Sequence, residues 1–441
     1  MASRNAYDLS HYSFMCGEIG RLQTLSLIPV VAGDSFSLDA MGVFRLSPLR
    51  RDLTIDAKVD LFAFYVPHRH IYGDDWLDFI KQGIDETVSF GTFTVGSGRD
   101  LSYLGWNKMT AGTWPSWINA GYNRIWNRYF RVPTDDGSIL GDDDYPAAAS
   151  VKTRQYGRLC ARLKSLWTTG VDREVDADDR RITIKDADLS AVKDDGITSS
   201  ASAAIDLLDI AKVRARYRTE VQREWFGQRY NDVLDDTWGA RVNIDADERP
   251  QLVMRSSRWL SGYDVDGTGD ENLGQYSGKA ASMVELRIPR KFFPEHGALW
   301  IMALVRFPSI HEGEQHYLYR QSQPTYKEIA GDPDIMGAEP PHELFSNQIL
   351  EGGTTSLGVF PYGQWYRTHP SVTHTLYEDL DGFPFLKVTP STKNGARYVS
   401  SDDYDRVFQT TQLGHWRSQA RINLLAHRLI PSAQASIFAG A

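Results

Sequence analysis

Alternating apolar and polar residues near the N-terminus constrain the fold of this chain more than any other feature. Every even-numbered residue from 36 to 46 is apolar or glycine, whereas the odd-numbered ones include Asp39 and Arg45. Alternate side chains of a strand point to opposite faces, so this pattern predicts a strand with one buried face. Residues 59–65 alternate in the same way after a turn. We therefore expect antiparallel β-structure early in the chain.

Further strand patterns occur far from this region. Strands are expected at 22–31, 252–254 and 420–426, and residues 299–307 are apolar on both faces, as in a central strand. Long stretches separate these segments, so they predict one discontinuous β-sandwich and not a row of separate domains.

Composition narrows the class of protein. The chain has 441 residues, of which 41% are hydrophobic, so it can bury a large core. Its two cysteines, Cys16 and Cys160, cannot form a disulfide framework and lack zinc-site spacing, which favours a reducing cytoplasm. We expect a soluble protein without a secretion signal or membrane span. The net charge of −9 argues against a generally basic nucleic-acid binder, but segregated charge leaves room for a local basic face.

Several long strings carry a resemblance to a known family. They are RLSPLRR, DLFAFYVPHRH, GYDVDGTGDENLGQYSG, PEHGALWIMALVRFP, AGDP and GQWYR. Together they resemble the major capsid proteins of microviruses of the φX174 type, which are small icosahedral single-stranded DNA bacteriophages. The match recurs from Asp8 to the last expected strand and is loosest at 83–116 and 171–200. The resemblance implies a mainly β protein, an eight-stranded antiparallel jelly-roll sandwich with two long insertions that contain helices and irregular loops.

That fold divides the chain at positions that agree with the strand patterns. We expect a single discontinuous capsid domain over 1–441. Its parts are the first jelly-roll strands at 21–70, a large insertion with helices at 71–249, the middle strands at 250–308, a second insertion at 309–415, and the last strand with a C-terminal tail at 416–441.

The resemblance also implies a structural function and a set of partners. Many copies would assemble into an icosahedral shell that encloses a circular single-stranded DNA genome, without catalysing a reaction. The implied partners are a spike protein, internal and external scaffolding proteins, a small basic DNA-packaging protein, the packaged DNA and host lipopolysaccharide, with assembly in the host bacterial cytoplasm. A glycan-binding or glycan-cleaving β-sandwich is the alternative. It is suggested by the acidic residues and by tryptophans at positions 114, 117, 365 and 416.

Basic residues interleaved with aromatic ones point to DNA. Guanidinium groups neutralise phosphates, and aromatic faces stack on unpaired bases. Such patterns occur at 117–131 and 152–167, and a basic helical segment spans 212–229. The DNA-contact candidates are Arg124, Arg128, Arg131, Arg154, Arg158, Arg162, Arg214 and Arg218. Pairing with the acidic runs at 135–144 and 172–180 is the alternative, and the inner surface of a DNA-filled shell favours contact with phosphates.

The second insertion is expected to supply subunit contacts. It is rich in aromatic residues and arginine, which are enriched at the anchors of protein interfaces. The candidates are Tyr319, Tyr326, Trp365 and Tyr366. For residues 1–20 two interpretations stay open, an arm on a neighbouring subunit and an ordered terminus on its own domain.

No catalytic motif is present, and no cofactor is predicted. Asp264, Asp266 and Asp270 resemble the first half of a calcium loop, but the twelfth position is Gln275 and not glutamate. An acidic surface turn is therefore favoured, with an irregular calcium site as the alternative. His68 and His70 would share one face at a strand end, and we expect them to pack or hydrogen-bond because no third metal ligand is near in sequence. The same interpretation applies to the pair at 295–296.

Overall fold

The structure is a computed structural model of the whole chain. The residues that it describes are 4–49, 56–82, 90–95, 102–105, 112–131, 158, 230, 234–235, 238–242, 249–260, 265–266, 275–276, 280–308, 315–333, 342–345, 348, 356–360, 362–367, 369–370 and 401–430.

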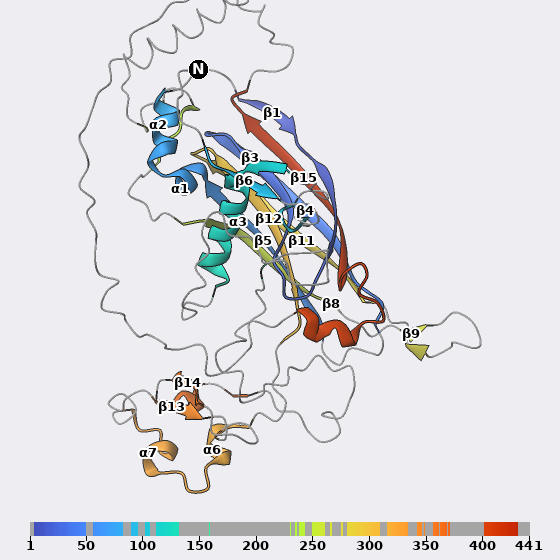
Figure 1. Cartoon of the computed structure of the whole chain (residues 1–441), viewed down its shortest axis with the longest axis vertical. Helices are drawn as coiled ribbons and strands as arrows, with labels where there is room; N and C mark the ends of the chain where they lie inside the picture. Colours follow the sequence, from blue (N-terminus) through green and yellow to red (C-terminus); the bar gives the residue numbers. More distant parts are fainter. Residues whose placement is uncertain are drawn as a thin grey trace, which may run out of the picture.

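Two antiparallel sheets form the centre of the molecule (Figure 1). In the first sheet β4 lies between β15 and β11, and both β1 and β2 pair with β15. The second sheet has the order β3, β12, β5, β8. The bounds are β1 Asn5–Asp8, β2 His11–Gly17, β3 Gln23–Val30, β4 Asp34–Leu46, β5 Ala57–Pro67, β8 Gln251–Leu260, β11 Ala281–Phe293, β12 Gly297–Arg306 and β15 Trp416–Arg428. The expectation of a mainly β, antiparallel sandwich is confirmed.

Strands from the two ends of the sequence are neighbours in the first sheet. Strand β1 pairs with the C-terminal part of β15, and β2 pairs with its N-terminal part. Of the two interpretations of the N-terminal segment, residues 5–17 therefore fit an ordered terminus on its own fold. Strands β1 and β2 occupy the same place beside β15. Each sheet therefore has four strand positions, in an order compatible with a jelly roll. The eight-strand jelly-roll assignment stays a prediction.

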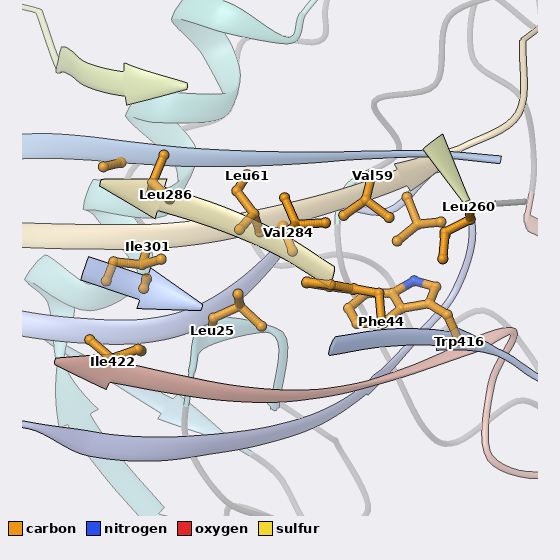
Figure 2. Close-up of a cluster of buried hydrophobic side chains, with 14 of the residues drawn as sticks. Leu25, Phe44, Val59, Leu61, Leu260, Val284, Leu286, Ile301, Trp416 and Ile422 are labelled. Carbon is orange, nitrogen blue, oxygen red and sulfur yellow. The ribbon is translucent and has the colours of Figure 1, made fainter. Parts of the chain in front are cut away.

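The main core lies between the two sheets (Figure 2). On β4, the side chains of Phe36, Leu38 and Phe44 are buried, as the alternation predicts. Phe44 and Trp416 pack with ring centroids 5.6 Å apart, and Val59 of the second sheet belongs to the same cluster. The segments 22–67, 250–307 and 418–429 contribute to one core, as expected.

A second apolar cluster covers the outer face of the β3–β12–β5–β8 sheet. Helix α3 (Ser116–Tyr129) packs there with the short 3-10 turn η2 (Ser102–Leu104), and Trp300 of β12 lies at the contact. A Cβ atom on Gly121 would lie 2.9 Å from Cζ2 of Trp300. The glycine therefore lets the helix approach the sheet closely.

Two helices follow β5 directly. The short helix α1 spans His68–Tyr72, and α2 spans Asp74–Gln82 with Asp74 and Asp75 in its first turn. Helix α2 lies at the start of the insertion 71–249, for which helices were expected. The placement of His68 and His70 at the end of a strand was wrong, because the chain turns into α1 after Pro67.

The remaining elements are short. Helices α6 and α7 and strands β13 and β14 lie apart from the sandwich (Figure 1). Their bounds, with those of the other short elements, are β6 Thr92–Val95, β7 Gly112–Pro115, β9 Val265–Asp266, β10 Gln275–Tyr276, α6 Tyr317–Arg320, α7 Tyr326–Ile329, β13 His342–Phe345, β14 Ser356–Phe360, and the 3-10 helices η4 Gln364–Tyr366 and η7 Ser401–Val407.

Candidate nucleic-acid and subunit interfaces

The aromatic residues of α3 pack into the protein. Tyr122, Trp126 and Phe130 are at most 8% exposed, and they contact the outer face of the β3–β12–β5–β8 sheet. Phe62 and Phe64 of that sheet meet Phe130 edge-on, with centroids 5.4 and 6.1 Å apart. The prediction that the aromatic residues of 117–131 are free to stack on bases is therefore wrong for these three, since the sheet already covers their faces.

The three arginines predicted on this segment differ in their surroundings. Arg124 is partly buried, and its guanidinium group donates to the backbone carbonyls of His70 and Ile71. It therefore fastens α3 to α1. Arg128 is exposed on the last turn of the helix, and Arg131 follows it, half-buried. A phosphate can reach Arg128 without displacing any packed group.

One residue of the next basic stripe is described. The backbone nitrogen of Arg158 donates to the hydroxyl of Tyr122 over 2.9 Å, and its carbonyl accepts from the backbone nitrogen of Leu22. These bonds hold the backbone at this position between α3 and the start of β3. The candidates at 154, 162, 214 and 218 lie outside the described residues.

A basic cluster that the sequence analysis missed surrounds Asp60 of β5. The Asp60 carboxylate is fully buried and accepts from Arg255 over 3.0 Å and from Arg306 over 2.9 Å. Both arginines are partly exposed, and one carboxylate cannot neutralise two guanidinium groups. Arg255 and Arg306 lie 195 and 246 residues from Asp60 along the chain. Sequence patterns show only local neighbours, so they could not predict this cluster.

An exposed tryptophan lies beside this cluster. The ammonium group of Lys58 lies 5.5 Å from the ring centre of Trp259, which is 53% exposed. Arg255 also lies over the ring of Phe62, which contacts the end of α3. Cations with one exposed aromatic face can bind a single strand in a salt-sensitive way. This Asp60 cluster is therefore a second candidate surface for DNA.

The subunit-contact candidates gather in the small unit of α6, α7 and η4. Tyr319, Tyr326 and Tyr366 are between 50% and 78% exposed. A capping box at Thr325 and Glu328 fixes the start of α7, which carries Tyr326. The His316 side chain caps α6, which carries Tyr319. Exposed tyrosines on fixed backbone are suitable anchors for a second subunit.

Trp365 differs from the other three candidates. It is 2% exposed, stacks on Tyr317 at 4.7 Å and donates its ring N–H to the carbonyl of Glu328. Burial makes Trp365 the packing centre of this unit, and its assignment as a subunit contact stays a prediction. Its candidacy as a direct subunit contact has no support in this structure.

A buried polar network joins α1 to the start of β12. Arg69 donates to both carboxylate oxygens of Glu295, at 2.9 and 3.3 Å, and the Tyr230 hydroxyl donates to the same carboxylate. Burial and the Glu295 charge raise the pKa of Tyr230 above its usual range. The ion pair with Arg69 gives Glu295 a structural role.

Two histidines beside this network are held neutral. Burial lowers the pKa of His68 to about 4, and the same cause, with a smaller effect of His68, lowers the pKa of His296 to about 4. The His68 ring packs against Trp76 and Trp117. Packing therefore accounts for His68.

The described residues contain no group of three histidine, cysteine or acidic side chains that could hold a metal ion. Asp264 and Asp270 lie outside those residues. Asp266 pairs through its backbone with Gln275 across the two short strands β9 and β10, and its side chain is not described. None of the helices in the described part of the chain is long and apolar enough to cross a membrane.

Comparison with known proteins identifies the family. A family described as capsid protein (F protein) matches residues 1–185 and 175–438. Capsid protein F of Enterobacteria phage phiK is 39% identical over 442 residues, which cover 99% of this chain and 98% of that protein. The same protein of Escherichia phage alpha3 is 39% identical, and that of Escherichia phage G4 is 38% identical, each with the same two shares. The resemblance seen in the sequence is confirmed, and the chain belongs to the capsid protein F family of the microviruses.

Proposed function

We propose that this chain is the major capsid protein of a microvirus, and that many copies close into a small icosahedral shell around a circular single-stranded DNA genome. The observation that carries this function is family membership over almost the whole chain, with relatives named capsid protein F. The virion is the place of action of such a protein. The same membership supports a structural role, and we infer that the chain catalyses no reaction.

The finer partners belong to the proposal as well. They are a spike protein, internal and external scaffolding proteins, a small basic DNA-packaging protein and the packaged DNA, with host lipopolysaccharide as a surface ligand and assembly in the bacterial cytoplasm. The second insertion supports subunit contact, because three exposed tyrosines project from α6, α7 and η4. The exposed Arg128 and the Asp60 cluster support contact with phosphates.

The glycan alternative loses its basis. Tryptophan must expose a ring face to stack on a sugar, but Trp365 and Trp416 are at most 2% exposed, and Trp114 and Trp117 pack on the helix-covered cluster. The comparisons give no support to a glycan-binding or glycan-cleaving protein.

The test is the size and content of the assembled particle. The full chain is expressed together with the scaffolding and spike proteins of the same genome, with and without replicating circular DNA, and the products are separated by sedimentation. We expect particles of megadalton mass in which this chain is the major protein and single-stranded DNA resists nuclease until the shell is opened. A monomer or small oligomer under every condition would contradict the proposal.

A further inference from the structure

Among the described residues, no helix covers the outer face of the first sheet, which is formed by β1, β2, β15, β4 and β11. Helix α3 covers the second sheet, whereas the outward residues of β2, β15 and β4 in the first are exposed or half-exposed. We call the part of this face around the start of β15 the open sheet face. Its residues are Tyr12, Phe14, Met41, Val43, Arg45, Arg417, Gln419 and Arg421.

Two aromatic rings are displayed on this face. Tyr12 is 65% exposed and Phe14 is 72% exposed, and their rings are nearly parallel, with centroids 6.5 Å apart and an interplanar angle of 18°. Exposing two large rings to water costs free energy that burial would recover. Their i, i+2 spacing on a strand fixes both rings on one side of the sheet.

Three arginines lie on the same face as these rings. Arg417 of β15 lies directly opposite Arg45 of β4, and like charges at such positions repel. Arg421 lies over the ring of Tyr12 at 5.8 Å. Within the described part of the chain, neither Arg45 nor Arg417 forms an ion pair.

The acidic residues of this face lie away from that pair. Asp39 and Glu285 lie on the same face, but Asp39 is opposite Asn423 and Glu285 is opposite Met41, so neither is opposite Arg45 or Arg417. Asp8 is the last residue of β1. Hydrogen bonds from Ser10 and, to a smaller extent, the charge of Arg421 lower the pKa of Asp8, so Asp8 partly offsets Arg421 but not Arg45 or Arg417. The positive charge therefore concentrates at the start of β15.

We propose that the open sheet face binds single-stranded DNA, with bases stacked on Tyr12 and Phe14 and phosphates held by Arg45, Arg417 and Arg421. This inference rests on the proposed function and assigns the genome to the outer face of the first sheet. Arg128 and the Asp60 cluster lie on the outer face of the opposite sheet and are then the alternative DNA surface. A polyanion relieves the repulsion between Arg45 and Arg417, and it supplies flat bases for the two rings in the same ligand. A protein partner would have to supply both acidic side chains and ring-stacking groups, so the nucleic acid fits with fewer requirements.

The salt dependence of DNA binding distinguishes the contribution of the arginines from that of the aromatic rings. A fluorescent oligodeoxythymidine is titrated with the purified full chain at several salt concentrations, and fluorescence anisotropy gives the affinity. Each phosphate contact contributes about 0.7 to the slope of log affinity against log salt for single strands. We expect R417Q to lower the slope by about 0.7 and R45Q/R417Q/R421Q to lower it by about 2. The control variant R287Q replaces an exposed arginine that lies opposite Asp39 on the same face. We expect it to leave the salt slope unchanged.

The rings are tested at constant salt. Base stacking on an aromatic side chain is worth about 5- to 150-fold in affinity for each base. We expect Y12A and F14A to weaken binding within that range with the salt slope unchanged, and Y12F to bind like the original chain. Y12F keeps the ring face and removes only the hydroxyl, so it controls for the loss of ring area.

The outcomes separate DNA from a protein partner. A triple variant that keeps both its affinity for DNA and its salt slope would overturn the inference. A triple variant that binds DNA normally but is no longer incorporated into particles would also overturn it, because this face would then be a protein contact. R417Q removes one of two opposed charges, so its melting temperature should not fall, and it serves as the folded variant if the triple variant unfolds. Subunits that bind DNA through this face but never form shells would contradict the proposed function alone.

Discussion

The indole ring of Trp416 occupies the space where a side chain on Gly17 would lie. A Cβ atom added to Gly17 would be 2.1 Å from Cε2 and Cζ2 of Trp416. The two residues face each other across β2 and β15, and the ring N–H of Trp416 donates to the carbonyl of Glu18. The N-terminal strand is thus fitted to the last strand of the sandwich through one glycine and one tryptophan.

Gly17→Ala is expected to destabilise the subunit because the added methyl group has no room. Overpacking of this kind costs about 1–3 kcal/mol in the free energy of unfolding. Trp416→Phe leaves space beside position 17, so the double variant should lose less stability than the sum of the single variants. Denaturant unfolding of all four proteins measures this coupling, and strict additivity would contradict the contact.

Phe36 and Phe44 are fully buried between the sheets, and their truncation tests the core. Replacing either by alanine should lower the free energy of unfolding by about 3–5 kcal/mol, through lost transfer energy and the cavity left behind. Phe14→Ala is the control, because Phe14 is 72% exposed and its loss should change stability by about 0.5 kcal/mol or less. Equal melting midpoints for F36A, F44A and F14A would disprove the core assignment.

The buried pair of Arg69 and Glu295 should be sensitive to the loss of either partner. Both side chains are about 5% exposed or less, so R69M leaves an uncompensated buried carboxylate and should cost about 3–5 kcal/mol of unfolding free energy. Replacing both residues by apolar ones, as in R69M/E295L, should recover much of that loss. D235N, which removes an exposed ion pair with Arg241, should cost about 1 kcal/mol or less, and a similar cost for R69M would count against the buried network.

The stability of the subunit should fall in mildly acidic solution because of His68 and His296. Their pKa values are about 4 in the folded protein and near 6.5 when unfolded, so only the unfolded chain takes up these protons between those values. Their contribution is complete above about pH 6.5 and is lost progressively as the pH falls toward 4. H296Q should flatten this dependence, as measured by urea unfolding from pH 7.5 to pH 4. An equally steep pH dependence in H296Q would contradict the account.

The strands of the sandwich could be predicted where one face is apolar and the other polar. The alternation over 36–46 gave β4, and the doubly apolar run at 299–307 gave β12. Strands β1 and β2 were not predicted, since their outward residues include Tyr12 and Phe14 and the usual contrast between faces is lost. The alternation over 59–65 predicted β5, but the five residues of α1 were too few to signal a helix.

The candidate surfaces were less predictable than the fold. Arginine and aromatic residues alternate along α3 as they would in a DNA-binding segment, but the aromatic side faces the sheet, and only packing reveals this. Asp60 with its two arginines, and Arg45 with Arg417, come together from strands far apart in sequence. Local patterns cannot show such pairs, so the exposed rings and opposed charges emerged only from the folded chain.

An image reconstruction of the DNA-filled particle tests the central claim most directly. We expect a closed shell built from this chain, with the α6–α7 tyrosines at contacts between subunits. The face that bears Tyr12, Phe14 and Arg417 should line the interior against density for the genome. A reconstruction without a closed shell, or one in which that face points outward and makes no contact with DNA, would contradict the central claim.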